Sequence, residues 1–496
     1  MLTEELLAEL PMAWPIGRLP VDVTGVAGDS RRIRPGEIFV AIPGYREDGH
    51  QYVADARRRG AALVVGERAE ALWSGPAVVV RDSREALGLL AAALCGHPSK
   101  ELRMFGVTGT NGKTSTTHLL GAILEAAGVP TAVVGTVGVM LHGERQSLER
   151  TTPDAGDLQP LLRHLKDRGA RAVCMEVSSH ALELRRVVGC EFDGAVFTNL
   201  TQDHLDFHGT LSRYRDAKVR LFSPLGGSYR GAPKKGRKWA AINVDDPSAP
   251  VFLRRTSVPV VTYATGRMAE VRMTDVRVSR EGTDCTFTGP FGRLAVHLPF
   301  VGRFYALNAL AAVAAAHAEG VDGEAIVRGL ESAPSVPGRF EMVPGPWPFL
   351  VVVDYAHTPD GLDNLLRAAR DLTEGRILIV FGAGGDRDRT KRAPMAEVAS
   401  RMADVVILTE DNPRSEDPEQ ILDDLEAGAR GGFGTHVERI RDRRTAIREA
   451  LSLAEPGDTV LLAGKGHETY QIVGDQVTAF DDREVVRELL GGMGPW

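Results

Sequence analysis

The sequence has few cysteines, and they are far apart. Cys95, Cys174, Cys190 and Cys285 are the four cysteines among 496 residues. No two of them have the close spacing of a zinc site or a redox motif, and scattered thiols do not form the framework of a disulfide-rich domain. We therefore expect four reduced thiols, most of them buried.

Long apolar runs are also lacking. No stretch approaches the ~20 apolar residues that a membrane helix needs, and 43% hydrophobic with 25% charged residues is typical of a globular protein. The opening MLTEELLAELPMAWP has two early glutamates and no basic region before an apolar stretch, so a secretory signal is not expected. We predict a cytoplasmic protein without a membrane span.

A basic stripe is absent as well. The net charge is -7, and no Lys/Arg-rich stripe is interleaved with aromatic residues, which argues against a nucleic-acid partner. The basic run Lys234-Lys235-Gly236-Arg237-Lys238 is predicted to be a solvated loop. Small-molecule substrates are the expected partners. The sequence leaves the oligomeric state open, with a monomer as the working assumption.

Short β-rich runs alternate with helical stretches along most of the chain. This pattern is typical of an α/β fold with parallel sheets and crossover helices, and the length predicts about three domains. Breaks at residues 97–99 and 333–338 set the boundaries. We predict a smaller α/β domain over residues 1–98, a central P-loop-type ATPase domain with a parallel sheet over 99–335, and a Rossmann-like doubly wound domain over 336–496.

Individual elements follow from the same pattern. Strands are predicted at residues 37–42, 61–65, 172–177, 194–198, 350–353, 376–381, 404–409 and 459–463. Helices are predicted at residues 52–59, 84–94, 114–127 and 305–318, and a β-hairpin excursion at 260–299.

The strongest local signal is Gly106-Val107-Thr108-Gly109-Thr110-Asn111-Gly112-Lys113-Thr114-Ser115, between a predicted strand and a predicted helix. Glycines let backbone N–H groups close on phosphate oxygens, and Lys113 would neutralise the terminal phosphates while Thr114 reaches Mg²⁺. The strict Walker A pattern fails because Val107 stands five residues before Gly112. A plain glycine turn with a solvated lysine is the alternative, and such a loop alone indicates only binding of a nucleoside triphosphate.

Two further polar residues follow buried strands. Glu176 lies near the end of the strand 172–177, where a carboxylate is costly unless a cation meets it. His204 follows the strand 194–198, so both side chains should emerge at the carboxyl edge of one sheet, where ligands bind in open α/β folds. We predict that they converge on Mg²⁺, although a structural hydrogen bond is the commoner role for either residue alone.

A set of motifs makes the sequence resemble a known family. These motifs are Asp29-Ser30-Arg31, Thr108 to Thr114, Glu176-Val177-Ser178-Ser179-His180, Asn199 to His208, Tyr214 to Lys218, Asn308, Gly338-Arg339-Phe340-Glu341, Asp354 to Pro359 and Gly464-Lys465-Gly466-His467-Glu468. Together they resemble the Mur ligases of peptidoglycan synthesis, in particular the UDP-N-acetylmuramoyl-tripeptide synthetases. The resemblance covers nearly the whole chain.

This resemblance implies a three-domain ligase that uses ATP and Mg²⁺. Such an enzyme phosphorylates the D-Glu carboxylate of UDP-MurNAc-L-Ala-D-Glu, and an amino group then displaces the phosphate. The acyl phosphate supplies the good leaving group that a carboxylate lacks, and Mg²⁺ offsets the repulsion between the carboxylate and ATP. The three domains of such an enzyme are expected to close around their ligands.

The resemblance also implies roles for residues around ATP. The predicted ATP contacts are Gly109, Thr110, Asn111, Gly112, Lys113, Thr114, Asn308, Arg339 and Asp354. The predicted metal ligands are Thr114, Glu176, His204 and Lys218, and Lys113, Lys218, Glu176 and His204 form the predicted catalytic group. Lys218 resembles a lysine that CO₂ converts to N6-carboxylysine, since an unmodified ammonium would repel the metal. A surface lysine is the alternative.

Two substrate pockets are implied in the same way. Ser30, Thr151, Thr152, Ser178 and Arg186 match positions that hold the UDP-sugar, although each hydroxyl alone could simply cap a turn. Leu184 stands where many relatives carry a glutamine, which removes one polar contact. Arg387, Asp411, Asn412, Arg414, Gly464 and Glu468 match the pocket of the added amino acid.

The form of the second pocket favours meso-diaminopimelate. An arginine at position 414 can hold the extra carboxylate of that molecule with two hydrogen bonds. The same reaction with L-lysine or L-ornithine is an alternative. A folylpolyglutamate-synthase-like ligase is another, and a P-loop phosphotransferase or regulatory ATPase is a third.

Overall fold

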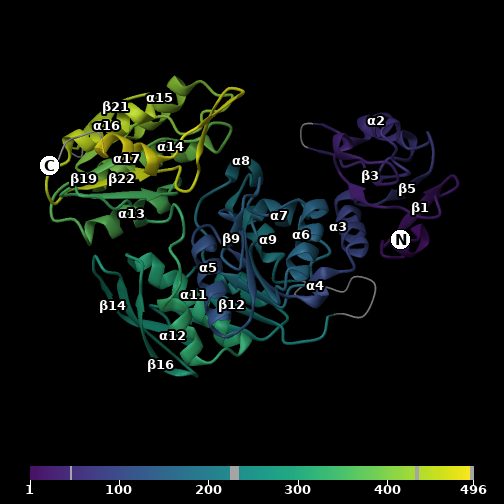
Figure 1. Cartoon of the computed structure of the whole chain (residues 1–496), viewed down its shortest axis with the longest axis horizontal. Helices are drawn as coiled ribbons and strands as arrows, with labels where there is room; N and C mark the ends of the chain where they lie inside the picture. The colour runs from purple at the N-terminus through teal and green to yellow at the C-terminus, as the bar shows by residue number, and fades with distance from the viewer. Residues whose placement is uncertain (45–46, 224–233, 430–434, 492–496) are drawn as a thin grey trace.

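The computed structural model describes residues 1–44, 47–223, 234–429 and 435–491. Three large β-sheets follow one another along the chain, each packed against helices, and a small two-stranded sheet over residues 470–479 comes after them. Figure 1 shows the first unit in purple at one end of the molecule, the central unit beside it, and the third unit in green and yellow on the other side. The predicted α/β class with parallel sheets is confirmed.

The first unit contains a five-stranded sheet in the order β1-β5-β4-β3-β2. Strands β2 to β5 are parallel, and β1 runs antiparallel to β5. Two small apolar clusters lie on its two faces. Its helices and strands are α1 (Thr3–Ala8), β1 (Ala13–Ile16), β2 (Val26–Ala27), β3 (Ile38–Val40), α2 (Val53–Arg58), β4 (Leu63–Gly66), β5 (Ala77–Val80) and α3 (Ser83–Leu94).

The central unit contains an eleven-stranded sheet in the order β16-β15-β14-β13-β12-β11-β6-β10-β7-β8-β9. The strands from β14 to β7 in this order are parallel, and the outer strands are antiparallel. The short helix α4 (Pro98–Glu101) leads into this sheet. The strands are β6 (Arg103–Thr108), β7 (Thr131–Gly135), β8 (Gly138–Leu141), β9 (Glu144–Gln146), β10 (Ala172–Glu176), β11 (Gly194–Phe197), β12 (Trp239–Asn243), β13 (Val260–Ala264), β14 (Val271–Val278), β15 (Thr283–Gly289) and β16 (Gly292–Leu298).

Helices cover both faces of this sheet, which explains why its middle strands are apolar throughout. Along β6, Met104 packs into the cluster under one layer of helices, whereas Phe105 and Val107 pack into the cluster under the other. The helices are α5 (Lys113–Ala126), α6 (Ala155–Asp167), α7 (Ser179–Glu183), α8 (Leu205–His208), α9 (Leu211–Val219), α10 (Ala249–Arg255), α11 (Arg303–Glu319) and α12 (Gly323–Glu331).

The third unit contains a six-stranded sheet in the order β17-β18-β22-β19-β20-β21, parallel except for β17. Helices lie on both faces, as expected of a doubly wound fold. The elements are β17 (Glu341–Met342), β18 (Leu350–Asp354), α13 (Pro359–Arg370), β19 (Ile377–Phe381), α14 (Arg392–Met402), β20 (Val405–Leu408), α15 (Pro418–Ala429), β21 (His436–Arg439), α16 (Arg443–Leu453), β22 (Thr459–Ala463), β23 (Tyr470–Val473), β24 (Gln476–Ala479) and α17 (Asp482–Gly491).

The units are joined in two different ways. One apolar cluster continues from the central sheet through α11 into α13 and α14, with Phe304 and Phe340 ring centroids 6.0 Å apart. The first unit meets the central unit partly through ion pairs, including Arg32 with Asp157 at 2.6 Å. The joint on one side of the central unit is therefore mainly apolar, and the joint on the other side is partly ionic.

The predicted strands and helices agree with the structure to within two residues at each end. The stretch 260–299 differs from the prediction. It is not a separate hairpin, because β13 continues the parallel sheet and β14 to β16 extend it as an antiparallel meander.

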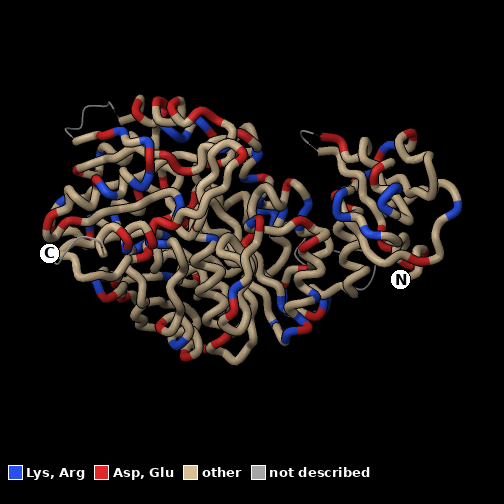
Figure 2. The backbone as a smooth tube through the Cα atoms, turned by 45° about the horizontal axis from the view of Figure 1, so that its top comes forward, with Lys and Arg blue, Asp and Glu red and all other residues tan. Residues whose placement is uncertain are grey.

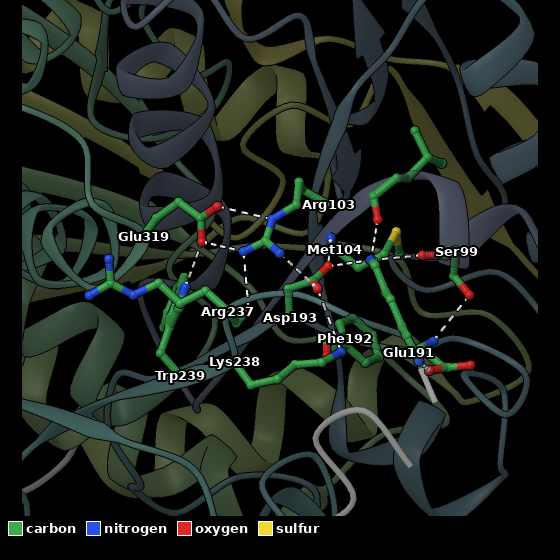
Figure 3. A network of polar contacts seen from close by, with 12 residues as sticks. Ser99, Arg103, Met104, Glu191, Phe192, Asp193, Arg237, Lys238, Trp239 and Glu319 are labelled. Atoms are coloured by element: carbon green, nitrogen blue, oxygen red, sulfur yellow. Dashed lines mark hydrogen bonds and ion pairs between the residues drawn. The ribbon is translucent and has the colours of Figure 1, made fainter. Parts of the chain in front are cut away.

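The basic run at residues 234–238 is only in part the predicted solvated loop, because residues 235–237 are exposed whereas Lys234 and Lys238 are not. Lys234 is 6% exposed, and its ammonium contacts the buried carboxylate of Asp193 and donates to Ser99 O at 2.8 Å. Lys238 donates to Phe192 O at 2.8 Å. Figure 3 shows the network around Asp193 at the amino edge of the central sheet. A buried carboxylate recruits these lysines, which the local sequence does not reveal.

Charges are mixed over the rest of the molecule. Figure 2 shows blue and red segments interspersed in all three units. No helix within the described ranges is both long and apolar enough to cross a membrane.

Candidate active site

The phosphate loop connects β6 to α5 at the carboxyl edge of the central sheet. Gly112 has a φ of 83°, and a Cβ at this position would lie 2.2 Å from Oδ1 of Asn308. Only glycine therefore allows α11 to approach the loop so closely. Nζ of Lys113 donates to the carbonyl oxygens of Gly109 and Thr110 at 2.9 and 2.8 Å. The lysine thus lies over the loop and not in solvent, as a phosphate-binding lysine requires.

Asn111 fixes the loop to the end of the neighbouring strand β11 and to the third unit. Its N–H donates to Oδ1 of Asn199 at 2.9 Å, and its carbonyl oxygen accepts from Oγ1 of Thr198 at 2.7 Å. Its side-chain Nδ2 donates to Oδ2 of Asp360 at 2.5 Å. Asp360 lies in the first turn of α13, so the third unit reaches the phosphate loop directly.

Lys218 is buried beside the loop. Its side chain lies on α9, is 1% exposed, and donates from Nζ to Gly109 O at 2.7 Å. Lys113 donates to the same oxygen, so two ammonium groups would share one acceptor. Burial, followed by the charge of Lys113, holds the pKa of Lys218 far below its usual value. The surface-lysine alternative is wrong, and conversion to an anion would replace this repulsion by attraction.

Glu176 and His204 reach the same region from β10 and β11. Glu176 is 1% exposed, and its carboxylate accepts from N and Oγ1 of Thr136 at 2.7 and 3.1 Å. His204 has a left-handed φ of 55°, and its Nε2 lies 3.2 Å from Oδ2 of Asp203. Burial holds the pKa of His204 well below its usual value, which leaves a neutral imidazole with one free lone pair.

The donor set suits a magnesium ion that arrives with its substrate. In the part of the chain that the structure describes, no three His, Cys, Asp or Glu side chains are grouped as a metal site. Glu176 and Thr114 supply oxygen, which Mg²⁺ prefers, and this ion commonly binds through one or two carboxylates, substrate phosphates and water. A sparse set of protein ligands therefore fits Mg²⁺ better than a metal that needs a complete protein cage.

Arg339 and Asp354 come from the start of the third unit. Nη2 of Arg339 donates to Oγ1 of Thr114 at 3.0 Å, and its guanidinium lies 4.8 Å from the ring centroid of Tyr355. Asp354 accepts from the N–H groups of Phe340 and Ala356 at 2.6 and 2.7 Å, and burial raises its pKa. The structure thus bonds Arg339 directly to Thr114, whereas Asp354 bonds to backbone groups around Arg339 and its contact with ATP stays a prediction.

A cavity of about 1900 Å³ lies between the first unit and the central unit. Ser30, Leu184 and Arg186 are among the residues that line it. Arg186 forms an ion pair with Asp154 at 2.7 Å, and burial lowers the pKa of this arginine. The size of the cavity and the arginines that line it suit a large anionic ligand such as a sugar nucleotide.

Three predicted sugar contacts lie behind this cavity and bond to protein atoms. Thr151 contacts Thr136 through their hydroxyls at 3.1 Å. Oγ1 of Thr152 donates to Glu176 O at 2.9 Å, and Ser178 caps α7 by accepting from Ala181 N–H at 3.1 Å. These hydroxyls hold the backbone between Glu176 and the cavity. Their contact with a sugar stays a prediction.

The six predicted amino-acid contacts lie together at the carboxyl edge of the third sheet. Arg414 has a φ of 53° and donates to Gly385 O at 2.9 Å, and Asn412 donates from Nδ2 to Oε2 of Glu468 at 2.8 Å. Burial and the nearby Arg414 lower the pKa of Arg387. Two adjacent guanidinium groups favour an anion between them, because it would offset their repulsion.

The backbone brings Gly464 and Asp411, two further members of this set, into contact. Gly464 has a φ of 107°, and a Cβ there would lie 2.5 Å from Oδ2 of Asp411. A glycine is therefore required for β22 to end beside Asp411.

Sequence analysis missed three polar residues that join these clusters. Asp360 binds Asn111, as described above. Lys391 lies 3.7 Å from Oδ1 of Asp203 and connects the third unit to the central unit. Asp203 directly precedes His204 and lies within the motif Asn199 to His208, although that motif gave it no role. Contacts between units have no local pattern.

Comparisons with known proteins agree with this geometry. Three family models match the chain: "Mur ligase family, catalytic domain" over residues 22–94, "Mur ligase middle domain" over 107–316, and "Mur ligase, glutamate ligase domain" over 338–466. The UDP-N-acetylmuramoyl-L-alanyl-D-glutamate–2,6-diaminopimelate ligase of Geobacillus thermodenitrificans is 45% identical over 487 residues, which is 98% of this chain and 99% of that protein. The chain belongs to the Mur ligase family.

Other Mur ligases support this membership. The diaminopimelate ligase of the same name from Bacillus licheniformis is 44% identical over 96% of each chain. A solved structure of a protein titled UDP-N-acetylmuramoyl-L-alanyl-D-glutamate–2,6-diaminopimelate ligase is 35% identical, with a TM-score of 0.67 over 95% of both chains. The Mur ligase relationship therefore spans all three units.

Proposed function

We propose that this Mur ligase joins meso-2,6-diaminopimelate to UDP-MurNAc-L-Ala-D-Glu at the expense of ATP, forming an amide bond. The observation that carries the proposal is the pocket in which Arg414 lies near both Arg387 and Glu468. The distal end of diaminopimelate bears one carboxylate and one ammonium, so it needs both charges in one pocket. The names of relatives that are 44–45% identical support the same substrates.

We assign one ligand to each part of the chain. Residues 1–98 together with the cavity beside Arg186 would hold the UDP-sugar, residues 99–335 would hold ATP, and residues 336–496 would hold the amino acid. The bond between Arg339 and Thr114 and the bond between Asn111 and Asp360 support a shared site between the last two parts. Since ATP is a cytoplasmic metabolite, we place the reaction in the cytoplasm.

The residues around the loop suit phosphoryl transfer to a carboxylate. Lys113 would exchange its loop carbonyls for the terminal phosphates of ATP, and Arg339 has further N–H donors for a phosphate oxygen. Thr114, Glu176, His204 and a carbamylated Lys218 would hold Mg²⁺, whose charge offsets the repulsion between ATP and the substrate carboxylate. The amino-acid pocket would then present an amine to the acyl phosphate.

A product assay tests the proposal. The purified protein is given ATP, Mg²⁺ and UDP-MurNAc-L-Ala-D-Glu with meso-diaminopimelate, L-lysine or L-ornithine in parallel. We expect the tripeptide product and ADP with diaminopimelate, and phosphate release only when both co-substrates are present. A product with L-lysine or L-ornithine in place of diaminopimelate would show that the enzyme adds that amino acid instead. ATP hydrolysis without either co-substrate would favour a regulatory ATPase.

A further inference from the structure

Lys465 is a fully buried lysine behind the amino-acid pocket. It follows β22 and lies between Gly464 and Gly466, both of which have positive φ. Its side chain is 0% exposed, and Nζ lies 3.3 Å from Oδ1 of Asn412, 3.9 Å from Oδ1 of Asp411 and 3.7 Å from Oε2 of Glu468. One ammonium therefore contacts three of the side chains that are predicted to bind the amino acid.

Opposing effects act on the charge of the Glu468 carboxylate. Burial, followed by the charge of Asp411, raises the pKa of Glu468, whereas Lys465 lowers it. Two carboxylates in one partly buried pocket repel each other, and protonation of one of them would relieve this repulsion. The charged or titratable groups that face Glu468 are Asp411, Lys465, Arg414, Arg443, Tyr355 and Tyr470.

The arginines in this region have other partners. Arg443 is also fully buried, but its Nε and Nη2 donate to the two carboxylate oxygens of Asp482 at 2.8 and 2.7 Å. Arg414 donates to the backbone oxygens of Gly385 and Asn412. Lys465 is thus the cation whose ammonium stands directly between Asp411 and Glu468.

We propose that Lys465 is a positioning residue for the amino-acid substrate, which keeps the Glu468 carboxylate charged and fixed beside Asp411 so that it can accept the distal ammonium. This inference rests on the proposed function. An ammonium on the ligand binds an ionised carboxylate strongly and a protonated one weakly, so Lys465 acts on the substrate through Glu468.

The test compares Lys465→Met and Lys465→Gln with the wild-type chain. The KM for meso-diaminopimelate, ATP and the UDP-linked substrate is measured from pH 6.5 to pH 9. The ratio of variant to wild-type KM is used, because titration of the attacking amine then cancels. Near neutral pH we expect the KM of the variants for diaminopimelate to be about tenfold or more above the wild-type KM, as for loss of a charged hydrogen bond. This ratio should fall as the pH rises, because Glu468 in the variants then loses its proton.

The ratios for ATP and for the UDP-linked substrate should stay within about twofold, because Lys465 contacts neither predicted site. Lys465→Gln keeps a hydrogen-bond donor for Asn412, and it carries the test if the methionine variant does not fold. Lys234→Met is the matched control, since it removes another buried lysine, which lies at the amino edge of the central sheet and far in sequence from the amino-acid pocket. It should lower the thermal unfolding midpoint without a pH-dependent change in the diaminopimelate KM.

Two results would overturn the inference. A diaminopimelate KM ratio that does not vary with pH would exclude an effect on the charge of Glu468, and a parallel rise in all three KM values would indicate only a structural role. Failure of the wild-type protein to join any diamino acid would refute the proposed function instead. The two failures are therefore distinguishable.

Discussion

Arg339 donates a hydrogen bond to the hydroxyl of Thr114 at 3.0 Å, across the boundary between the third unit and the phosphate loop. Thr114 is the residue whose hydroxyl is predicted to reach Mg²⁺. A guanidinium has five N–H donors, so Arg339 can bind the γ-phosphate side of a nucleotide as well as this hydroxyl. The contact therefore makes nucleotide binding and the position of the third unit depend on each other.

Arg339→Ala should weaken ATP binding more than it weakens the fold. Loss of a hydrogen bond to a charged group predicts a rise of about 10- to 100-fold in the KM for ATP. Arg293→Ala is a matched control, because Arg293 on β16 forms an exposed ion pair with Asp275 on β14. The KM of this variant for ATP should remain near the wild-type value. Equal KM values for the two variants would contradict the role of Arg339.

The bond between Asn111 and Asp360 predicts a difference between two substitutions at one position. Asp360→Ala removes the acceptor for Asn111 and should weaken ADP binding about fivefold. Asp360→Asn retains an acceptor oxygen and should bind ADP almost as the wild-type chain does. Isothermal titration calorimetry measures both, and an equal loss in the two variants would show that the hydrogen bond does not position the loop.

Arg414→Ala should change the choice of amino acid. If its guanidinium holds the extra carboxylate of diaminopimelate, kcat/KM for diaminopimelate should fall about 10- to 100-fold, and the value for L-lysine should change much less. Arg441→Ala serves as a control within the same unit, because Arg441 pairs with Glu410 near the surface. Equal losses with both amino acids would reject the role of Arg414.

Lys218 should make the activity depend on CO₂. Depleting dissolved CO₂ should lower the wild-type rate, and bicarbonate should restore it, because the predicted N6-carboxylysine forms reversibly. Lys218→Ala should have little activity in either condition, since it has neither the anion nor the amine that forms it. Mass spectrometry under native conditions offers a second measurement, because the N6-carboxyl group adds the mass of CO₂ to the wild-type chain. A wild-type rate that ignores bicarbonate would argue against the modification.

His118 should contribute to the loss of stability in acid. Burial, followed by the charges of Arg339 and Arg145, lowers its pKa from 6.5 to about 4. The unfolded chain therefore binds more protons between these values, so stability falls as the pH drops from about 6.5 to about 4 and then levels off. At about 1.4 kcal/mol per pKa unit, the effect is on the order of 3 kcal/mol.

The measurement for His118 is the thermal unfolding midpoint as a function of pH. His118→Gln removes the titrating group, so its midpoint should fall less steeply below pH 6.5 than that of the wild-type chain. Identical slopes would mean that other groups account for the acid sensitivity.

The sequence predicted those features that depend on local pattern. The buried strands are apolar on both faces, and the glycines with Lys113 and Thr114 stand between a strand and a helix, so their positions followed from spacing alone. Features that depend on distant residues were not predictable in this way. Oγ1 of Thr152 bonds to the carbonyl oxygen of Glu176 and to the N–H group of Ser178, which come close to it only in the folded sheet.

Buried charges gave the least signal. Lys234 and Lys465 are surrounded in the sequence by glycines, lysines or other polar residues, a composition that usually indicates a surface loop. Each is buried where a carboxylate from another segment meets it in the interior, Asp193 for Lys234 and Asp411 for Lys465. Whether such a lysine is buried depends on its carboxylate partner. The sequence alone does not show which carboxylate lies beside the lysine in the folded chain.

The apolar contact between α11 and α13 limits how the nucleotide cleft can open. Swinging the third unit away would hydrate the hydrocarbon surface around Phe304 and Phe340, at about 25 cal/mol for each Å², whereas a sliding motion would keep that surface dry. Salt weakens exposed ion pairs but does not weaken apolar contacts. Raising the ionic strength should therefore weaken the contact between the first and central units, beside the proposed sugar-nucleotide cavity. The contact between the central and third units, beside the proposed ATP site, should remain.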